Sequence, residues 1–349
     1  MTSLGAAPTV RAHISSRRRH SAVNGGPRIL RTEGSKPMTR VRVRVRSVLA
    51  LVPAMLLPLT ACGSGGDDAP KNVSASTAAL GTITPGVLKV AVEPYAPYTT
   101  VKDGKIVGLD GDIINYAAKK LGLKVVPDVT DFAGMLAGVQ SRRDDITVGG
   151  VAWTAERQKQ GLFTDPPYYS PPAMAVRSGK AYSTVDDLKG LSLGTVTGYV
   201  WVKSIQAVPG AELHSYPNAN GVFDDLGAGR IDVGFLDPLL IIAAQKARPE
   251  LKIQTEYLTP PTAAQVKAKP AYAYFRPYQT GFYLPKQATK LEKAISAQID
   301  AMYANGELAK LITKWGGDPQ QFLVPASDVA TARRGVDRPA GWTPPSIAK

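Results

Sequence analysis

The chain has 349 residues, 44% hydrophobic and 20% charged, a composition that suits a globular protein of one or two domains. Its formal charge of +14 is uneven, because residues 1–61 hold 11 of the 42 basic and one of the 28 acidic residues. With the rest near neutrality, nucleic acid is excluded as an expected partner. The single cysteine, Cys62, excludes an internal disulfide, and three histidines are too few to favour a histidine triad or a multi-histidine metal site.

The N-terminal region divides into two segments. Residues 1–37 are rich in Arg, Ser and Gly without periodicity, and we predict that they are a misassigned extension and that Met38 is the true start. Residues 38–61 have basic residues, then a 13-residue apolar run, then small residues, which is typical of an export signal. The apolar run is too short for a membrane-spanning helix, which needs roughly 20 residues.

The signal ends in the sequence LTAC, which resembles the lipobox of bacterial lipoproteins. In such proteins the cysteine is acylated, for example with palmitate, and becomes the new N-terminus. The resemblance implies a lipid anchor at Cys62 on the outer face of the cell membrane, and the alternative is an ordinary signal peptide with a fortuitous cysteine. Residues 62–83 comprise this cysteine and a Gly- and Ser-rich stretch that predicts a flexible tether.

Strand and helix patterns alternate along the body of the chain. The first run predicts strands at 87–92, 123–126 and 145–148 and helices at 111–121 and 131–140. The second predicts strands at 173–177, 191–196, 213–216 and 231–236, and helices at 185–188, 199–207, 221–226 and 237–247. A strand at 280–284 and helices at 289–303 and 306–315 follow. This alternation favours an α/β fold with parallel sheets covered on both faces.

The segment 145–169, DITVGGVAWTAERQKQGLFTDPPYY, carries the strongest binding pattern. Its strand leads into Gly149 and Gly150, where the lack of side chains lets a ligand approach the main chain. Thr154 is expected to cap a short helix, which places Arg157 one turn in. A guanidinium matches a carboxylate in a bidentate way, so the pattern predicts half of a site for a small carboxylate-bearing molecule. The alternative is a strand–turn–helix with one solvated arginine.

The run GGVAWTAERQK, followed by FTDPPYY, resembles the signature of the bacterial extracellular solute-binding proteins of family 3, the amino-acid receptors of ABC-type uptake systems. The resemblance extends from about residue 86 to 317. It implies a two-lobed, hinge-linked periplasmic-binding-protein fold of type II, each lobe a mostly parallel sheet flanked by helices. Lobe 1 is expected at 84–173 plus 282–322 and lobe 2 at 174–281. The Pro-rich tail, 323–349, is expected to be disordered.

The family's motifs assign roles to several residues by position. An arginine one turn after the central strand grips the ligand's α-carboxylate, which implies this role for Arg157. Ala152 stands where the family usually has a hydroxyl, so only backbone groups at Gly150 and Ala152 are expected to contact the ligand there. Asp237, in IDVGFLDP, stands where an acidic residue pairs with the α-ammonium. Its place before Pro238 equally fits a helix N-cap.

Further cleft residues follow from the same resemblance. Tyr199 crowds the strand-to-helix turn GTVTGY, and Val200 replaces a frequent hydroxyl. Tyr95 and Phe132 fall where the family stacks aromatic rings on the ligand, although Phe132 also fits the core face of its helix. Glu93 lies one residue away from a position that contacts polar side chains in some members.

The resemblance therefore implies an extracytoplasmic, monomeric lipoprotein that captures an amino acid or amino-acid-like molecule and delivers it to an ABC permease. It implies no cofactor, no metal and no nucleic acid. The alternative is a periplasmic enzyme on the same scaffold, a dehydratase acting on a cyclic dienyl acid, with Glu93 and Asp237 as the acid/base candidates. The pair Arg157 and Asp237 favours the receptor, because together they recognise both charges of a zwitterion.

Overall fold

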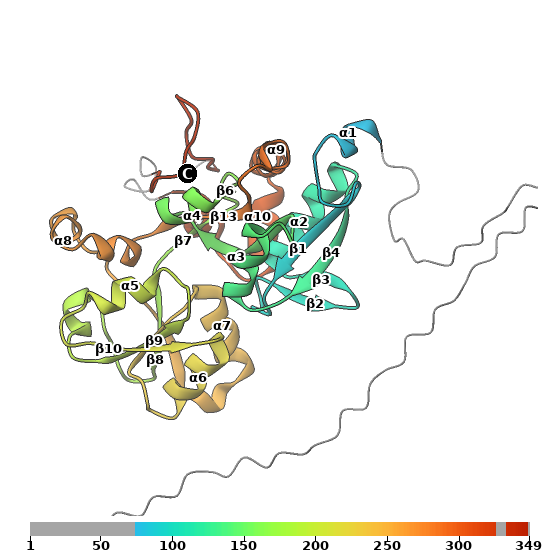
Figure 1. Ribbon diagram of the computed structural model, residues 1–349. Helices are drawn as coiled ribbons and strands as arrows, with labels where there is room; N and C mark the ends of the chain where they lie inside the picture. The colour runs from blue at the N-terminus through green and yellow to red at the C-terminus, as the bar shows by residue number, and fades with distance from the viewer. Residues whose placement is uncertain (1–73, 326–332, 348–349) are drawn as a thin grey trace, which may run out of the picture. The chain divides into compact units, whose positions relative to one another are not determined.

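A computed structural model describes residues 74–325 and 333–347 (Figure 1). The expected export signal, the acylation site Cys62 and the expected extension before Met38 all lie outside these residues. Among the helices that are described, none combines the length and the apolarity needed to cross a bilayer.

The first sheet is organised around β1 (Val87–Val92), whose neighbours β4 (Lys124–Val129) and β5 (Ile146–Ala152) run parallel to it. β13 (Tyr278–Pro285) returns antiparallel to β5 and also pairs with β6 (Gly161–Phe163) and β7 (Tyr169–Ser170). The helices of this lobe are α1 (Ala75–Ala78), α2 (Leu109–Lys120), α3 (Phe132–Gln140), α4 (Ala155–Gln160), α9 (Thr289–Ala304), α10 (Glu307–Lys314) and α11 (Pro319–Leu323). A separate hairpin joins β2 (Thr100–Lys102) to β3 (Lys105–Val107).

The second sheet has the order β10-β9-β11-β8-β12. Its parallel part comprises β9 (Ser192–Val196), β10 (Glu212–Tyr216) and β11 (Val233–Phe235), and its antiparallel part β8 (Ala173–Arg177) and β12 (Ile253–Tyr257). The helical elements here are η1 (Val185–Leu188), α5 (Trp201–Gln206), α6 (Ala219–Gly227), α7 (Pro238–Ala247), η2 (Pro249–Leu251), α8 (Ala263–Ala268) and η3 (Pro270–Phe275). The expected α/β class is confirmed, with antiparallel strands added to a parallel centre in each sheet.

The chain passes between the two sheets twice. It leaves the first sheet after Ser170 at the end of β7 and enters the second at Ala173 in β8. It returns between η3 and β13, which starts at Tyr278. Residues 278–281, which the sequence assigned to lobe 2, therefore pair within the first sheet. These two crossings form the hinge.

The strand that carries the binding motif is longer than predicted. The glycine pair was expected to end it, but β5 continues through Gly149 and Gly150 to Ala152. Both glycines have positive φ, at 106° and 65°, a conformation that a residue with a Cβ rarely adopts. Pairing of Val151 and Ala152 with β13 keeps the segment in the sheet beyond this distortion.

Two expectations about the ends of the body are corrected. The tether was predicted to run to residue 83, but the chain packs on the first lobe from residue 74: the Thr77 hydroxyl donates to Leu121 O, and Ile83 N–H donates to the Asp145 carboxylate. The tail was predicted to be disordered from residue 323, but Leu323 is buried and residues 333–347 bind the first lobe through Arg338 and its neighbours.

Asp145 supports a prediction about stability. The residue is 3% exposed, and its carboxylate accepts from Ile83 N at 2.7 Å and Lys89 N at 2.9 Å. Asp145→Ala removes the acceptor of two part-buried N–H donors and is expected to lower the free energy of unfolding by about 1–3 kcal/mol in urea titration. Asp186→Ala, which removes an exposed carboxylate paired with Lys189, is the control and should cost less than about 1 kcal/mol. Equal losses in the two variants would contradict the assignment.

Candidate functional site

A small cavity lies where elements of the two lobes meet. Its lining residues come from β5, α3 and α4 on one side, from the β9–α5 turn and the start of α7 on the other, and from β13: they are Phe132, Gly149, Gly150, Ala152, Arg157, Tyr199, Val200, Trp201, Asp237 and Tyr278. Seven of these ten were predicted from the sequence. The two other predicted residues, Tyr95 and Glu93, are hydrogen-bonded to lining residues.

Arg157 reaches the cavity from the first turn of α4. The side chain of Thr154 caps this helix and accepts from Arg157 N at 3.0 Å, as predicted. The guanidinium donates to Ala152 O at 2.9 Å and, across the cleft, to Gly198 O at 3.0 Å. It also lies 5.2 Å from the centre of the Phe132 ring. Among the described residues no carboxylate pairs with Arg157, so its positive charge is available to an anion.

Asp237 is held by three hydroxyl groups. Its Oδ1 accepts from Ser170 at 2.7 Å and from Tyr278 at 3.1 Å, and its Oδ2 accepts from Tyr95 at 2.7 Å. Asp237 occupies the N-cap position of α7, but its side chain makes no capping bond, so the capping interpretation is wrong for the carboxylate. Burial raises the pKa of Asp237, and the three hydroxyl bonds oppose that rise.

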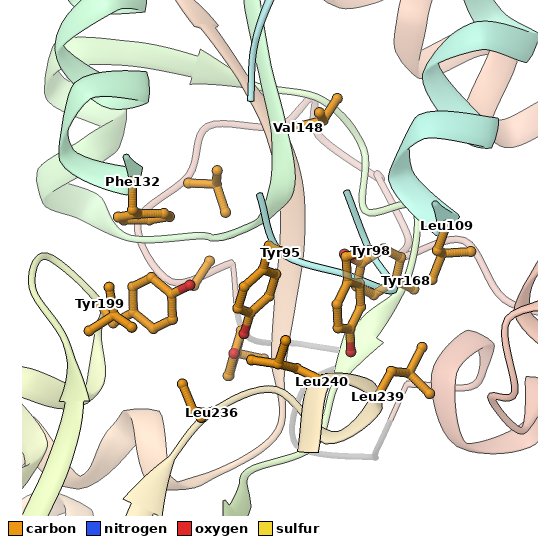
Figure 2. Close-up of a cluster of buried hydrophobic side chains, with 14 of the residues drawn as sticks. Tyr95, Tyr98, Leu109, Phe132, Val148, Tyr168, Tyr199, Leu236, Leu239 and Leu240 are labelled. Carbon is orange, nitrogen blue, oxygen red and sulfur yellow. The ribbon is translucent and has the colours of Figure 1, made fainter. Parts of the chain in front are cut away.

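Aromatic rings from both lobes lie near one another in this region, with Phe132 and Tyr95 on either side of Tyr199 in the contacts that it makes (Figure 2). Tyr199 packs edge-on against Phe132, with ring centres 4.7 Å apart, and 6.2 Å from Tyr95. The Tyr199 hydroxyl donates to Glu93 at 2.7 Å across the cleft. Burial raises the pKa of Glu93 to about 7, although the Tyr199 hydrogen bond acts in the opposite direction. Glu93 is therefore placed to bind a tyrosine of the other lobe.

The cavity is small. Its volume is about 20 Å³, which is enough for about one water molecule. A wider groove of about 480 Å³ begins at Arg157, Tyr199 and Val200, and Lys203 and Arg334 also line it. A molecule of amino-acid size reaches the cavity only if the lobes separate or the rings turn.

Three residues around the cavity were not predicted from the sequence. Ser170 and Tyr278 hold Asp237 from the two hinge crossings, and Asp110 lies behind the glycine pair. Asp110 accepts from Gly149 N at 2.8 Å and from the Tyr168 hydroxyl at 3.1 Å, and burial raises its pKa to about 7. No local pattern marks these residues, because their partners are distant in the sequence.

The described part of the chain has few side chains that could bind a metal ion or act as a catalytic histidine. It contains no group of three His, Cys, Asp or Glu side chains able to hold a metal ion. Its one histidine, His214, lies on β10 beside Glu212, away from the cavity lining. The charged groups around the cavity are one cation, Arg157, and the carboxyl groups of Asp237, Glu93 and Asp110.

A prediction about pH follows from Glu93. Its ordinary pKa of 4.5 is raised to about 7, so the folded state holds the proton more tightly than the unfolded chain. The corresponding stability is fully present below about pH 4.5 and is lost as the pH rises towards 7. Glu93→Gln should make the decline in unfolding free energy between pH 5 and 8 smaller by up to about 3 kcal/mol, with the contribution of Asp110 retained. Urea titrations at each pH measure it, and Glu250→Gln, which removes an exposed carboxylate paired with Arg248, should leave the profile unchanged. A Glu93→Gln profile that superimposes on the parent's would refute the assignment.

Comparison with known proteins places this site in context. The profile of the bacterial extracellular solute-binding proteins, family 3, matches residues 88–318. The chain is 30% identical over 240 residues to the L-cystine-binding protein TcyJ of Escherichia coli K12, covering 66% of this chain and 83% of that protein. It is 30% identical over 226 residues to ABC transporter arginine-binding protein 1 of the same organism, covering 63% and 86%. The solved structure of an ancestral arginine-binding protein bound to glutamine superimposes with a TM-score of 0.58 at 28% identity, over 67% of this chain and 99% of that one.

Proposed function

Because this chain belongs to the bacterial extracellular solute-binding proteins of family 3, we propose that its cleft binds a small zwitterion of the amino-acid class. The observation that carries the proposal is that Arg157 and Asp237 line one cavity, where a main-chain carbonyl and a hydroxyl group hold their side chains in place. Arg157 receives the α-carboxylate and Asp237 the α-ammonium. Backbone groups at Gly150 and Ala152 approach the ligand from β5.

The aromatic residues form the walls of the proposed site. Phe132 and Tyr199 line the cavity and bury the ligand's apolar atoms, with Tyr95 packed against Tyr199. Val200 also lines the cavity. The aromatic rings exclude water, which strengthens the charged contacts. Closure of the lobes about the hinge completes the burial.

The charge of the cleft favours some amino acids over others. Asp237 lines the cavity together with Arg157, and Glu93 and Asp110, whose pKa values are raised to about 7, lie near it and are partly ionised at neutral pH. An acidic ligand side chain therefore meets repulsion. Relatives are named for arginine, histidine and cystine. Arginine and histidine have no acidic side chain, and in cystine a second ammonium balances the second carboxylate. We infer a neutral or cationic amino acid or a close analogue.

The proposed physiological role is delivery of this ligand to the membrane subunits of an ABC permease. We propose that the chain does so as a monomer held on the outer face of the cell membrane by a lipid at Cys62. The dehydratase alternative finds no support, because the relatives compared are named as binding proteins.

A thermal-shift screen of the amino acids tests the binding proposal. A ligand present at a hundred times its dissociation constant stabilises the folded state by about 2.7 kcal/mol and raises the melting temperature. Neutral or cationic amino acids are expected to give the shift and acidic ones to give none. Arg157→Ala should weaken binding about 100-fold, since a bidentate charged pair is lost, and titration calorimetry measures this loss.

The control for this experiment is Arg230→Ala. Arg230 is an exposed arginine of the second lobe paired with Asp225, and its removal should leave ligand affinity unchanged. Binding that survives in Arg157→Ala, or a response only to compounds without a carboxylate, would overturn the proposed site.

The anchor is tested separately in cells. Cys62→Ser removes the acylation site, and the protein is expected to move from the membrane fraction to the soluble extracytoplasmic fraction, as judged by immunoblot. Labelling with a radioactive fatty acid should be lost in the same variant. Unchanged membrane association and labelling would show that Cys62 is not the anchor.

A further inference from the structure

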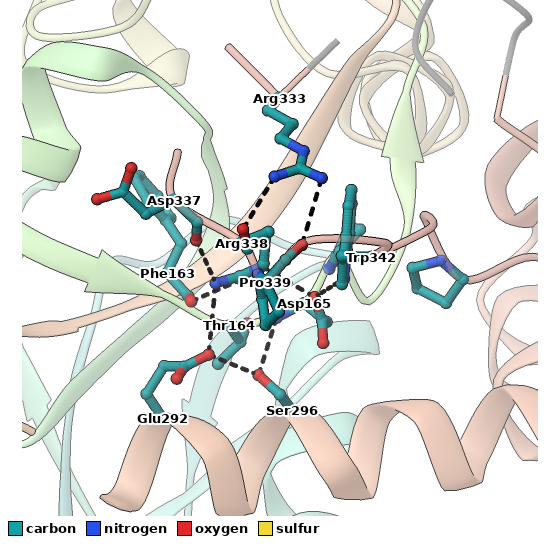
Figure 3. Close-up of polar contacts among 12 residues, drawn as sticks. Phe163, Thr164, Asp165, Glu292, Ser296, Arg333, Asp337, Arg338, Pro339 and Trp342 are labelled. Carbon is teal, nitrogen blue, oxygen red and sulfur yellow. Dashed lines mark hydrogen bonds and ion pairs between the residues drawn. The ribbon is translucent and has the colours of Figure 1, made fainter. Parts of the chain in front are cut away.

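The C-terminal segment 333–347, called the strap here, contacts both lobes. It lies beyond residues 88–318, where the family profile matches. Figure 3 shows its polar contacts with the first lobe. Two arginines, Arg338 and Arg334, make the contacts that define its path.

Arg338 anchors the strap to the first lobe. Its side chain is 8% exposed and forms ion pairs with Asp165 at 3.0 Å and Glu292 at 3.5 Å. It also donates to Phe163 O at 2.7 Å and lies 4.7 Å from the centre of the Trp153 ring. A buried guanidinium with two carboxylates is costly to disrupt, so this anchor is the stable end of the strap.

Trp342 and Pro345 extend the same anchor. The indole N–H of Trp342 donates to Asp165 at 2.7 Å, and the Tyr169 hydroxyl donates to Pro345 O at 2.7 Å. Tyr169 lies in β7, directly before the first hinge crossing. The strap therefore borders one of the two segments that join the lobes.

Arg334 binds the other side of the hinge. Its guanidinium donates to Ala273 O at 3.0 Å and to Pro277 O at 2.9 Å and lies 5.1 Å from the centre of the Tyr274 ring. Ala273 and Tyr274 belong to η3, which is fixed to the second lobe because Trp201 donates to Tyr274 O. Arg334 thus connects the strap to the second lobe and to the second hinge crossing.

The connection between the two arginines is short and constrained. Three residues separate them, so their Cα atoms lie at most about 14 Å apart. Arg334 has a φ of 48°, unusual for a residue other than glycine. At Gly335 a Cβ would lie 2.5 Å from that of Ala155, so the strap packs closely on α4, the helix that carries Arg157. The segment between Arg334 and Arg338 therefore cannot lengthen much.

We propose that the strap is a latch that favours the closed arrangement of the lobes, and that Arg334 is a positioning residue for ligand binding. The inference rests on the proposed binding function and deepens it. When the lobes open about the hinge, η3 moves relative to Asp165, and the short connection requires the Arg334 bonds to break. The latch therefore raises the closed population, and a ligand that is held by the closed state dissociates more slowly.

The distance between the lobes tests the latch without any ligand. Spin labels are placed at Lys119→Cys on α2 and Lys246→Cys on α7, both exposed, in the full chain carrying Cys62→Ser. Arg334→Ala is expected to add a population at longer distance in pulsed electron resonance. Gly335→Ala, which displaces the strap through Ala155, is expected to do the same.

Arg333→Ala is the matched control. Arg333 is an arginine of the same segment that donates to Arg338 O and Pro339 O within the strap. Its distance distribution should match the parent's. Unchanged distributions in both folded variants, Arg334→Ala and Gly335→Ala, would overturn the latch.

The binding readout follows with any amino acid that the screen identifies. The dissociation rate constant should rise roughly three- to tenfold in Arg334→Ala and stay unchanged in Arg333→Ala. An unchanged rate constant in Arg334→Ala would overturn the role of Arg334 in binding. If no ligand is found, the proposed function fails, while the distances still decide whether the strap is a latch.

Discussion

The hydroxyl groups around Asp237 are the interaction on which the arrangement of the two lobes depends. A buried carboxylate is stable only when its oxygens are hydrogen-bonded. Here the donors come from Ser170 before the first crossing, from Tyr278 after the second and from Tyr95 of the first lobe. Satisfying one charged group of the second lobe therefore fixes both hinge segments and the first lobe around it.

Arg157 completes this arrangement from the opposite direction. It belongs to the first lobe, yet one of its bonds crosses to Gly198 in the second. Tyr199 crosses back to Glu93. The groups proposed to hold the ligand are therefore the same groups that join the lobes, so binding and closure share a single set of contacts.

Local features of this site could be predicted from the sequence, and distant ones could not. Thr154 and Arg157 are three residues apart, and their relation depends only on the start of one helix. The glycine pair was placed correctly, but the continuation of β5 through it depends on pairing with β13, more than a hundred residues later. The same distance in sequence hid Ser170 and Tyr278, whose role depends on Asp237.

The ordered structure of the strap could not be predicted from the sequence either. Its Pro-rich composition and lack of periodicity predicted disorder, since such segments have few apolar side chains to bury. Its order comes from Arg338, whose partners Asp165 and Glu292 belong to separate elements of the first lobe. Composition does not report ion pairs of this kind.

The bonds from tyrosine to the cleft carboxylates also have a consequence for discrimination among solutes. Any incoming molecule competes with neutral hydroxyl donors that are already in place at Asp237 and Glu93. A sugar or an uncharged amide offers a donor of similar strength and gains little by the exchange, whereas an ammonium adds the attraction of a full charge. The tyrosine hydroxyls therefore set a threshold. A solute binds only if its contacts with these carboxylates are stronger than those of the hydroxyls that it displaces, whatever the shape of the pocket.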